Sequence, residues 1–327
     1  MANAQPSVRS YLGIAVETTK GTPETATDFI PINKDSFKPV DIINPLYDTG
    51  LRGSMVENYN YIQGRRHTES DLGGVIFADT IGYWLTGIMG DVATTGGSAP
   101  YAHEITLLNA TSGDAQPTSY TLTDYYVAGN RQYPGCQVHD FTMTFNADGQ
   151  LEYTTKVTGF PSVTDATVAP SFSAAVPTPV WAGEVSIGGA VIGYTTSGTV
   201  TMTRKIDPIF GINTYQGPYE VFLGALDTSA NLTFVMENDA ELVRFLNNTQ
   251  PVLNFAWTQG TGANLTTVAF NIAKGAYTTA AIDRSPDHVA ITVDVSGIGN
   301  TTDAGQTGGY APIQWYLQNA VPAGTYN

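Results

Sequence analysis

Residues 138–157 read VHDFTMTFNADGQLEYTTKV, and this stretch decides the fold class. Apolar side chains alternate with polar ones on both sides of residues 146–149, where Asn, Asp and Gly supply a turn. This pattern predicts an antiparallel β-hairpin with one apolar and one polar face. The apolar positions are Phe141, Met143 and Phe145 before the turn, and Leu151, Tyr153 and Val157 after it. Such a sheet, repeated around an oligomer, could line a cavity with its polar face.

The same alternation recurs in residues 289–295 and, near the C-terminus, at Ile313, Trp315 and Leu317. The chain has 327 residues with 34 Gly and 18 Pro, and only 13% of them are charged. That charged share is about half the usual value of roughly 25%, and the composition favours strands and turns over long surface helices. A chain of this length can bury a large core. The sequence therefore predicts a mainly β globular protein.

The charge balance excludes some classes of protein. Lys and Arg number 14 against 29 Asp and Glu, so the net charge is −15 and a basic nucleic-acid-binding groove is not expected. Cys136 is the single cysteine, and the residues after Met1 lack the pattern of a secretory signal, so we expect synthesis in a reducing cytoplasm. The longest apolar run, residues 74–90, is interrupted by Asp79 and is shorter than the ~20 residues of a membrane span.

Two segments have helical periodicity. In residues 79–89 the apolar side chains recur at helical spacing, which predicts a helix with one buried stripe. In residues 238–247, Asn238 and Glu241 have the spacing of a capping box. The stripe positions are Ile81, Trp84, Leu85, Ile88 and Met89 in the first helix, and Leu242, Phe245 and Leu246 in the second.

The order of elements suggests a duplication. An apolar strand precedes each helix, at residues 72–77 and 232–236, and alternating strands follow each one. Residues 160–180 are rich in Pro, Ser, Ala and Thr, as in an extended linker. We therefore expect two similar modules, residues 1–163 and 181–327, joined by a linker at residues 164–180.

Two long stretches, residues 44–64 and 204–220, show no clear periodicity and mix aromatic residues with charge and glycine. Loops of this length in a compact domain are usually functional or disordered, so we expect contacts with partner subunits, with a mobile, solvated loop as the alternative. Arg65 and Arg66, beside His67, could form salt bridges to a neighbouring subunit or lie in a solvated turn. The candidate contact residues are Tyr47, Arg52, Tyr59, Tyr61, Arg65, Arg66, Arg204, Lys205, Phe210, Tyr215 and Tyr219.

No catalytic, cofactor-binding or metal-binding residues are predicted. The sequence contains no phosphate-binding loop, nucleophile elbow, HExxH or CxxC motif. The four histidines are dispersed, and three of them have an adjacent carboxylate that would point to the opposite face of a strand. Cys136 lacks a basic immediate neighbour that would lower its pKa, so an inert thiol is expected.

Three segments resemble the tail tube (major tail) proteins of long-tailed, non-contractile bacteriophages. The first is residues 11–23, YLGIAVETTKGTP, followed by residues 28–32. The second is residues 133–138, YPGCQV, which lead into the hairpin that ends at residues 156–159. The third is the final strand, residues 312–319, PIQWYLQN. These patterns cover both termini and the middle of the chain.

The resemblance implies a structural virion protein of the tail that is not an enzyme and needs no cofactor. It implies β-sandwich modules with one flanking helix each, an N-terminal arm and long loops that reach the next ring. Six modules would form each ring, so two modules per chain would give three chains per pseudo-hexameric ring. Rings would stack into a hollow, acidic-lined conduit through which DNA passes during ejection.

The implied partners are further copies of the chain and the tape-measure, tail terminator and distal tail proteins. For stacking we expect the arm at residues 1–28 and the two long stretches to make the contacts between rings. Alternative functions are another phage structural protein, such as a head decoration or tail-tip component, and an acidic β-rich enzyme or adhesin acting on sugars.

Overall fold

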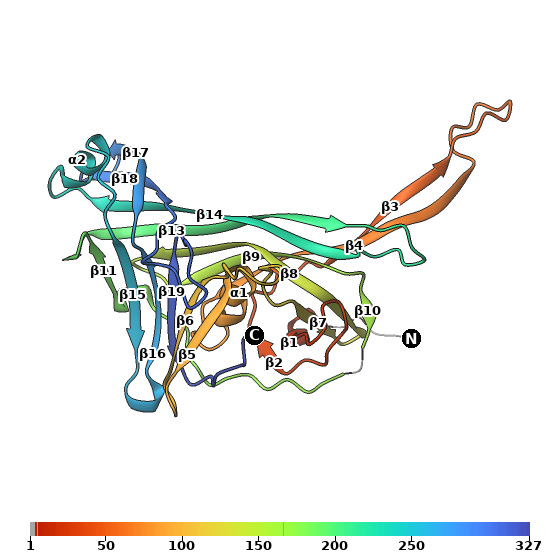
Figure 1. Cartoon of the computed structure of the whole chain (residues 1–327), viewed down its shortest axis with the longest axis horizontal. Coiled ribbons are helices and arrows are strands. Elements are labelled where there is room, and N and C mark those ends of the chain that lie inside the picture. Colours follow the sequence, from red (N-terminus) through yellow and green to blue (C-terminus); the bar gives the residue numbers. More distant parts are fainter. Residues whose placement is uncertain (1–3, 5, 166) are drawn as a thin grey trace.

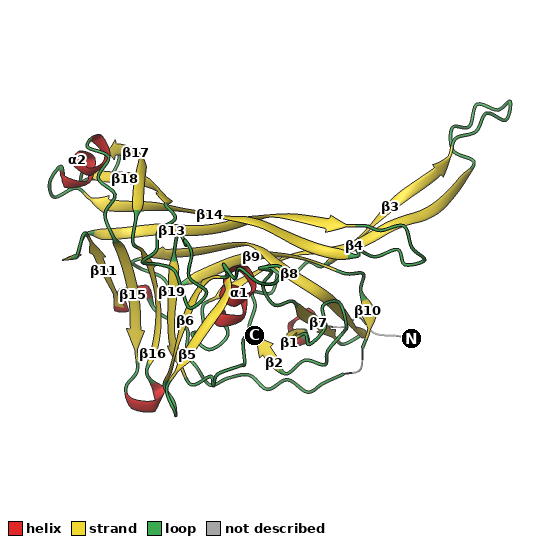
Figure 2. Cartoon of the chain, in the orientation of Figure 1, coloured by secondary structure: helices red, strands yellow, loops and turns green. Residues whose placement is uncertain are grey.

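The computed structural model describes residue 4, residues 6–165 and residues 167–327. Within these residues the chain forms two antiparallel sheets and two short α-helices (Figures 1 and 2). The predicted mainly β fold is confirmed. Three 3-10 helices cover Ser7–Arg9, Val180–Ala182 and Gly262–Asn264.

The large sheet has twelve strands and contains the hairpin predicted from residues 138–157. Its strands are β1 (Tyr11–Val16), β2 (Asp28–Ile30), β3 (Val40–Asp48), β4 (Asn60–Val75), β7 (Tyr120–Tyr126), β8 (Gly129–Asn146), β9 (Glu152–Gly159), β10 (Val163–Thr164), β13 (Thr195–Ile209), β14 (Glu220–Val235), β17 (Gly275–Asp283) and β18 (Ala290–Gly297). Strand β8 is central because it pairs with β7, β9, β10 and β13.

The small sheet has seven strands in the order β12-β11-β15-β16-β19-β6-β5. These are β5 (Gly90–Thr95), β6 (Tyr101–Leu107), β11 (Gly183–Ile187), β12 (Ala190–Ile192), β15 (Leu253–Gln259), β16 (Thr266–Ile272) and β19 (Gln314–Asn319). The C-terminal strand β19 was predicted, and it joins β16 to β6. Both sheets therefore combine strands from the two halves of the chain.

Aromatic side chains fill the space between the two sheets. Phe255 and Phe270 of the small sheet stack with ring centroids 4.8 Å apart, and Trp315 packs 5.3 Å from Phe270. Trp315 also makes an edge contact with Phe141 of β8, at 5.8 Å. Because the alternating apolar faces of both sheets meet here, one main cluster of buried residues includes members from both halves of the chain.

Part of the large sheet repeats its own strand order. Strands β3-β4-β9-β8 are neighbours in that order, and β13-β14-β18-β17 follow in the same order beside them. Strands β4 and β14 both have 16 residues and both lead into an α-helix. After each helix comes a hairpin of the small sheet, β5–β6 or β15–β16.

The irregularities of these strands repeat as well. The pairing of β8 with β9 skips His139, and the pairing of β17 with β18 skips Thr278 at the corresponding position. Likewise β4 has a bulge at residues 64–65, opposite Asn44 of β3, and β14 has one at residues 224–225, opposite Lys205 of β13. A bulge shifts the register of every residue beyond it, so its position is a specific feature of a strand pair.

Helix α1 (Ile81–Met89) is buried on all sides, so the prediction of a single buried stripe is wrong. Gly82 faces the ring of Tyr326, and Gly87 faces Val138 and Tyr120. The C-terminal segment and strands β7 and β8 therefore cover the face that the periodicity predicted to be exposed.

Helix α2 (Ala240–Leu246) is confirmed, but its predicted capping box is not formed. The Asn238 side chain accepts a hydrogen bond from the backbone N–H of Ala240. Glu241 is buried and accepts hydrogen bonds from the Tyr277 hydroxyl at 2.6 Å and from Arg244. Leu246, predicted to be in the buried stripe, is 69% exposed.

Two predictions about loops and the N-terminus need correction. Residues 44–64 and 204–220 are the ends of two hairpins rather than free loops, since strands β3–β4 and β13–β14 extend into them and leave only residues 49–59 and 210–219 as connecting loops (Figure 1). The expected arm at residues 1–28 is wrong for Tyr11–Val16, a largely buried strand paired with both β2 and β7. Residues 1–3 and 5 of that arm and residue 166 of the expected linker lie outside the described residues.

Two of the segments that carry the family resemblance meet at the buried Glu17. Its carboxylate accepts hydrogen bonds from the backbone N–H groups of Gly21 at 2.8 Å and Gly135 at 2.6 Å. The hydroxyls of Ser119 and Thr121 donate to the same carboxylate at 2.6 and 2.7 Å. Gly135 has a φ of +64°, and a Cβ there would lie 2.0 Å from the Phe160 ring, so only glycine fits.

A half-buried carboxylate on β7 gives a pH-dependent prediction. Burial raises the pKa of Asp124 to about 6, above its ordinary value of 3.8. Because the folded state binds this proton more tightly, the group's stabilising contribution is complete below pH 3.8 and is lost as the pH rises through 6. We expect Asp124→Asn to raise the free energy of unfolding at pH 7 by about 1–2 kcal/mol and to change it little at pH 4. Urea denaturation at the two pH values measures this, and equal effects at both would contradict it.

Candidate functional site

All eleven predicted contact residues lie on two neighbouring hairpins, β3–β4 and β13–β14 (Figure 1). Hairpin β3–β4 projects from the body, and its end, residues 46–62, is called the β3–β4 tip. The end of hairpin β13–β14, residues 209–220, is called the β13–β14 tip. Strands β4 and β14 are not paired with each other in the sheet order, so side chains and loops join the two hairpins.

The β13–β14 tip supports the base of the longer hairpin. The Arg65 guanidinium lies 4.6 Å from the ring centroid of Phe210, and the His67 ring meets the same phenyl edge-on at 6.0 Å. The backbone N–H of Arg66 donates to the carbonyl of Gln216 at 3.0 Å, and the Gln216 side chain donates to the carbonyl of Gln63 at 2.9 Å. These contacts hold Arg65 and Arg66 against the second hairpin of their own chain.

The β3–β4 tip is organised by its aromatic and charged residues. The rings of Tyr47 and Tyr61 lie 5.7 Å apart across the hairpin. Arg52 lies over the ring of Tyr59 at 4.6 Å and donates to Asp48 at 2.5 Å. The N–H of Gly50 and then Arg52 hold the pKa of the exposed Asp48 carboxyl below its ordinary value. The tip is therefore ordered by its own contacts.

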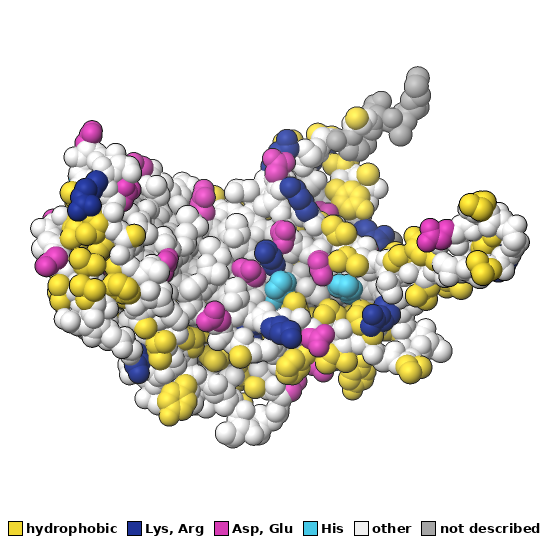
Figure 3. All heavy atoms as spheres, turned by 90° about the horizontal axis from the view of Figure 1, so that it is seen from above, with side chains coloured by type: hydrophobic (Ala, Val, Ile, Leu, Met, Phe, Trp, Pro, Cys, Tyr) yellow, Lys and Arg dark blue, Asp and Glu magenta, His cyan; other side chains and the backbone are white. Residues whose placement is uncertain are grey.

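Several apolar side chains of this tip are not covered by any part of the chain that the structure describes. Leu51 and Met55 are fully exposed, at 101% and 103%. Figure 3 shows apolar side chains on the projecting lobe that this hairpin forms. Exposed apolar groups gathered in one place mark a contact surface. The other exposed apolar residues of the β3–β4 tip are Leu46, Tyr47, Val56, Tyr61 and Ile62.

Arg204 does not belong to this surface, and its prediction as a contact residue is corrected. Its guanidinium is buried and donates to the carbonyls of Gly224 at 2.7 Å, Ile88 at 3.1 Å and Leu223 at 3.4 Å. Burial lowers its pKa to about 10. The side chain thus binds the second hairpin to the end of α1. The neighbouring Lys205 is exposed, as are Tyr215 and Tyr219.

The exposed face of the large sheet is polar and mostly uncharged. Threonines face one another across strand pairs, as in the 3.0 Å contact between the hydroxyls of Thr142 and Thr201. Figure 3 looks onto this face and shows uncharged groups with scattered charges of both signs. Acidic positions exceed basic ones on these strands. The acidic positions are Glu69, Asp71, Asp140, Glu152, Asp207, Asp227, Asp283 and Asp294, and the basic ones are Arg65, Lys156 and Lys205.

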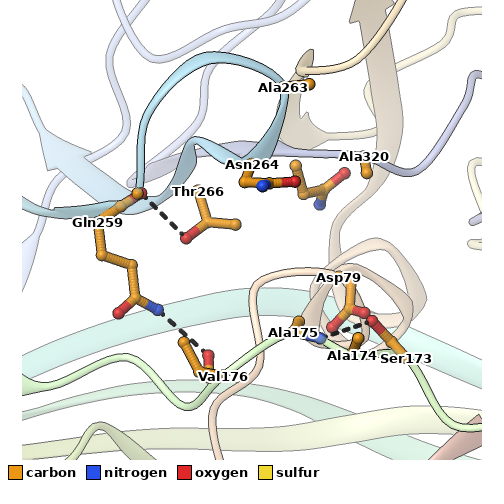
Figure 4. Close-up of a pocket in the computed structure, with 12 residues that line it drawn as sticks. Asp79, Ser173, Ala174, Ala175, Val176, Gln259, Ala263, Asn264, Thr266 and Ala320 are labelled. Carbon is orange, nitrogen blue, oxygen red and sulfur yellow. Dashed lines mark hydrogen bonds between the residues drawn. The ribbon is translucent and has the colours of Figure 1, made fainter.

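A cavity in the body of the chain offers little chemistry. A cavity of about 510 Å³ lies between the segment at residues 173–176 and the end of hairpin β15–β16 (Figure 4). The Gln259 side chain donates to the carbonyl of Val176 at 3.1 Å and fastens the segment there. Asp79 is the one titratable residue among those described as lining the cavity. A lone carboxylate supplies no acid–base or nucleophile–base pair.

Two other side chains of potentially reactive type, Cys136 and His103, are buried in the core. Cys136 is buried, and burial raises the pKa of its thiol. His103 is buried between Thr94 and Asn319, at 2.8 and 3.1 Å, and burial lowers its pKa. Among the described residues, no three His, Cys, Asp or Glu side chains come together as a metal site requires. None of the described helices is long and apolar enough to cross a membrane.

The sequence reasoning missed the apolar residues of the β3–β4 tip. Leu51, Met55 and Val56 lie in the stretch that was singled out for its tyrosines and arginines. Three large apolar residues among glycine, serine and charged residues were the available signal, since a solvated loop rarely needs them.

The fold and this surface define a mainly β protein with a projecting apolar hairpin suited to contact with other proteins. A family model described as phage tail tube protein matches residues 7–324, nearly the whole chain. The chain therefore belongs to the phage tail tube protein family and is a structural component of the virion tail. No individual curated protein matches the chain.

Proposed function

We propose that three chains close each ring of the tail tube and that the stacked rings form the conduit for DNA. The observation that carries the proposal is the repeated strand order β3-β4-β9-β8 and β13-β14-β18-β17, with bulges at equivalent positions. The two halves, residues 1–163 and 181–327, are then copies of one module joined by residues 164–180. Three chains supply six modules, which gives pseudo-sixfold symmetry.

The stoichiometry is tested by measuring the mass of isolated rings. Native mass spectrometry or light scattering on purified rings should give three times the mass of one chain. A ring of six chains would contradict the proposal, because the two halves would then not take equivalent places around one ring.

The polar face of the large sheet is the proposed channel wall. Its hydroxyl and amide groups give a hydrated surface, and its excess of carboxylates repels DNA phosphates. At physiological salt this repulsion acts over about 8 Å, enough to keep the duplex from adhering to the wall. The wall is hydroxyl-rich with a net negative charge, so the acidic lining is sparser than the sequence suggested. A reconstruction of the tube with this face turned outward would contradict the assignment.

The hairpins make the proposed contacts between rings. The β3–β4 tip extends beyond the body of the chain (Figure 1), and its exposed apolar groups need a partner surface. The end surfaces of the stack would meet the tail terminator and distal tail proteins, and the channel would hold the tape-measure protein. The single buried cysteine suits synthesis in the reducing host cytoplasm.

A further inference from the structure

The large sheet has two free edges that belong to the repeated units. Within the described residues, strand β3 pairs only with β4, and strand β17 pairs only with β18. Figure 1 shows these strands toward opposite ends of the molecule. A free edge presents unpaired N–H and C=O groups that can pair with another strand.

The chain contains an internal junction that shows how such edges join. Strand β8, the last of the first unit, pairs antiparallel with β13, the first of the second unit. In this junction Thr142 is opposite Thr201, and Asp140 is opposite Thr203. Strand β17 takes the place of β8 in the second unit, and β3 takes the place of β13 in the first.

The bulges fix which residues are equivalent. On β17, which has its bulge at Thr278 where β8 has one at His139, Ala281 corresponds to Thr142. On β3, aligned through Asn44 and Lys205, which face the bulges of β4 and β14, Val40 corresponds to Thr201. A second copy of the junction therefore places Val40 opposite Ala281.

We propose that β3 of one chain pairs antiparallel with β17 of the next, with Val40 opposite Ala281, so that the seam between chains repeats the β8–β13 junction. This inference rests on the proposed ring. The same register places Lys38 opposite Asp283, in the places of Thr199 and Thr144.

The side chains at the two edges suit this pairing. Val40 is 55% exposed in the single chain and Ala281 is also exposed, so pairing covers apolar surface. Lys38 and Asp283 are both exposed and carry opposite charges, which is favourable for residues directly across a strand pair. The N–H of Lys38 donates to the carbonyl of Asp71 at 3.2 Å, so the pairing of β3 with β4 already extends to this residue.

The register is tested by cysteine cross-linking of assembled full-length protein. Val40→Cys with Ala281→Cys should form a disulfide between chains on mild oxidation and give covalent trimers in denaturing gels. Val40→Cys with Ala280→Cys is the matched control, because neighbouring residues of a strand point to opposite faces. The parent chain serves as the background, since its single cysteine is buried.

A charge swap tests the same seam without oxidation. Lys38→Glu and Asp283→Lys should each reduce the assembled fraction, and the two together should restore it. Rings that assemble without the Val40–Ala281 cross-link, or with equal cross-linking of the control pair, would overturn the register. Cross-linked rings of six chains would instead overturn the stoichiometry and support the seam.

Discussion

Replacing Leu51 and Met55 together with aspartate should abolish tubes and leave unstacked rings or single chains. Both side chains are fully exposed in the single chain, so the free energy of unfolding should change by less than about 0.5 kcal/mol. In the tube, the proposed contact would bury two unpaired charges, which costs several kcal/mol at each contact. Electron microscopy and sedimentation of the purified variant measure the loss of tubes.

The matched control exchanges the two residues, Leu51→Met with Met55→Leu. This variant keeps the apolar character and the volume of the tip, so it should form tubes of ordinary length. Ordinary tubes from the double aspartate variant would show that the β3–β4 tip does not carry the contact between rings.

Replacing Glu17 with glutamine should destabilise the fold by about 3–5 kcal/mol. The Glu17 carboxylate accepts four hydrogen bonds, and the amide of glutamine would turn an N–H toward two of those donors. Each buried donor left without an acceptor costs about 1–3 kcal/mol. Denaturant unfolding of the unassembled chain measures the effect.

Glu24→Gln provides a control in the same segment. The Glu24 side chain accepts an exposed hydrogen bond from Thr18 at 2.9 Å, so its replacement should change the free energy of unfolding by less than about 0.5 kcal/mol. Equal losses in the two variants would mean that the buried hydrogen bonds of Glu17 are not the cause.

Local sequence patterns predicted those strands and helices that have one face packed on the core. The β8–β9 hairpin, strands β18 and β19 and both helices follow from alternation or helical spacing, because each has a face packed on the core. The ends of hairpins β3–β4 and β13–β14 did not follow from any pattern. Their strands extend past the core and are exposed on both faces, so their sequences have no need to alternate.

Features that depend on contacts between residues far apart in the sequence were also not predicted. Tyr326 covers Gly82, and Val138 and Tyr120 cover Gly87, so helix α1 is buried on all sides only when distant parts of the chain pack on it. Glu241 has the spacing of a capping residue, but it bonds to Tyr277 of a strand that comes later in the chain. The bulges opposite Asn44 and Lys205 depend on strand pairing, so the repeat of the two units is visible only in the register of the strands.

The most direct test of the central claim is a cryo-electron microscopy reconstruction of the assembled tube. It should show three chains per ring, with the polar face of the large sheet toward the axis and β3 of each chain paired with β17 of the next. A ring of six chains, or one in which the halves of a chain do not occupy equivalent places around the axis, would contradict the account.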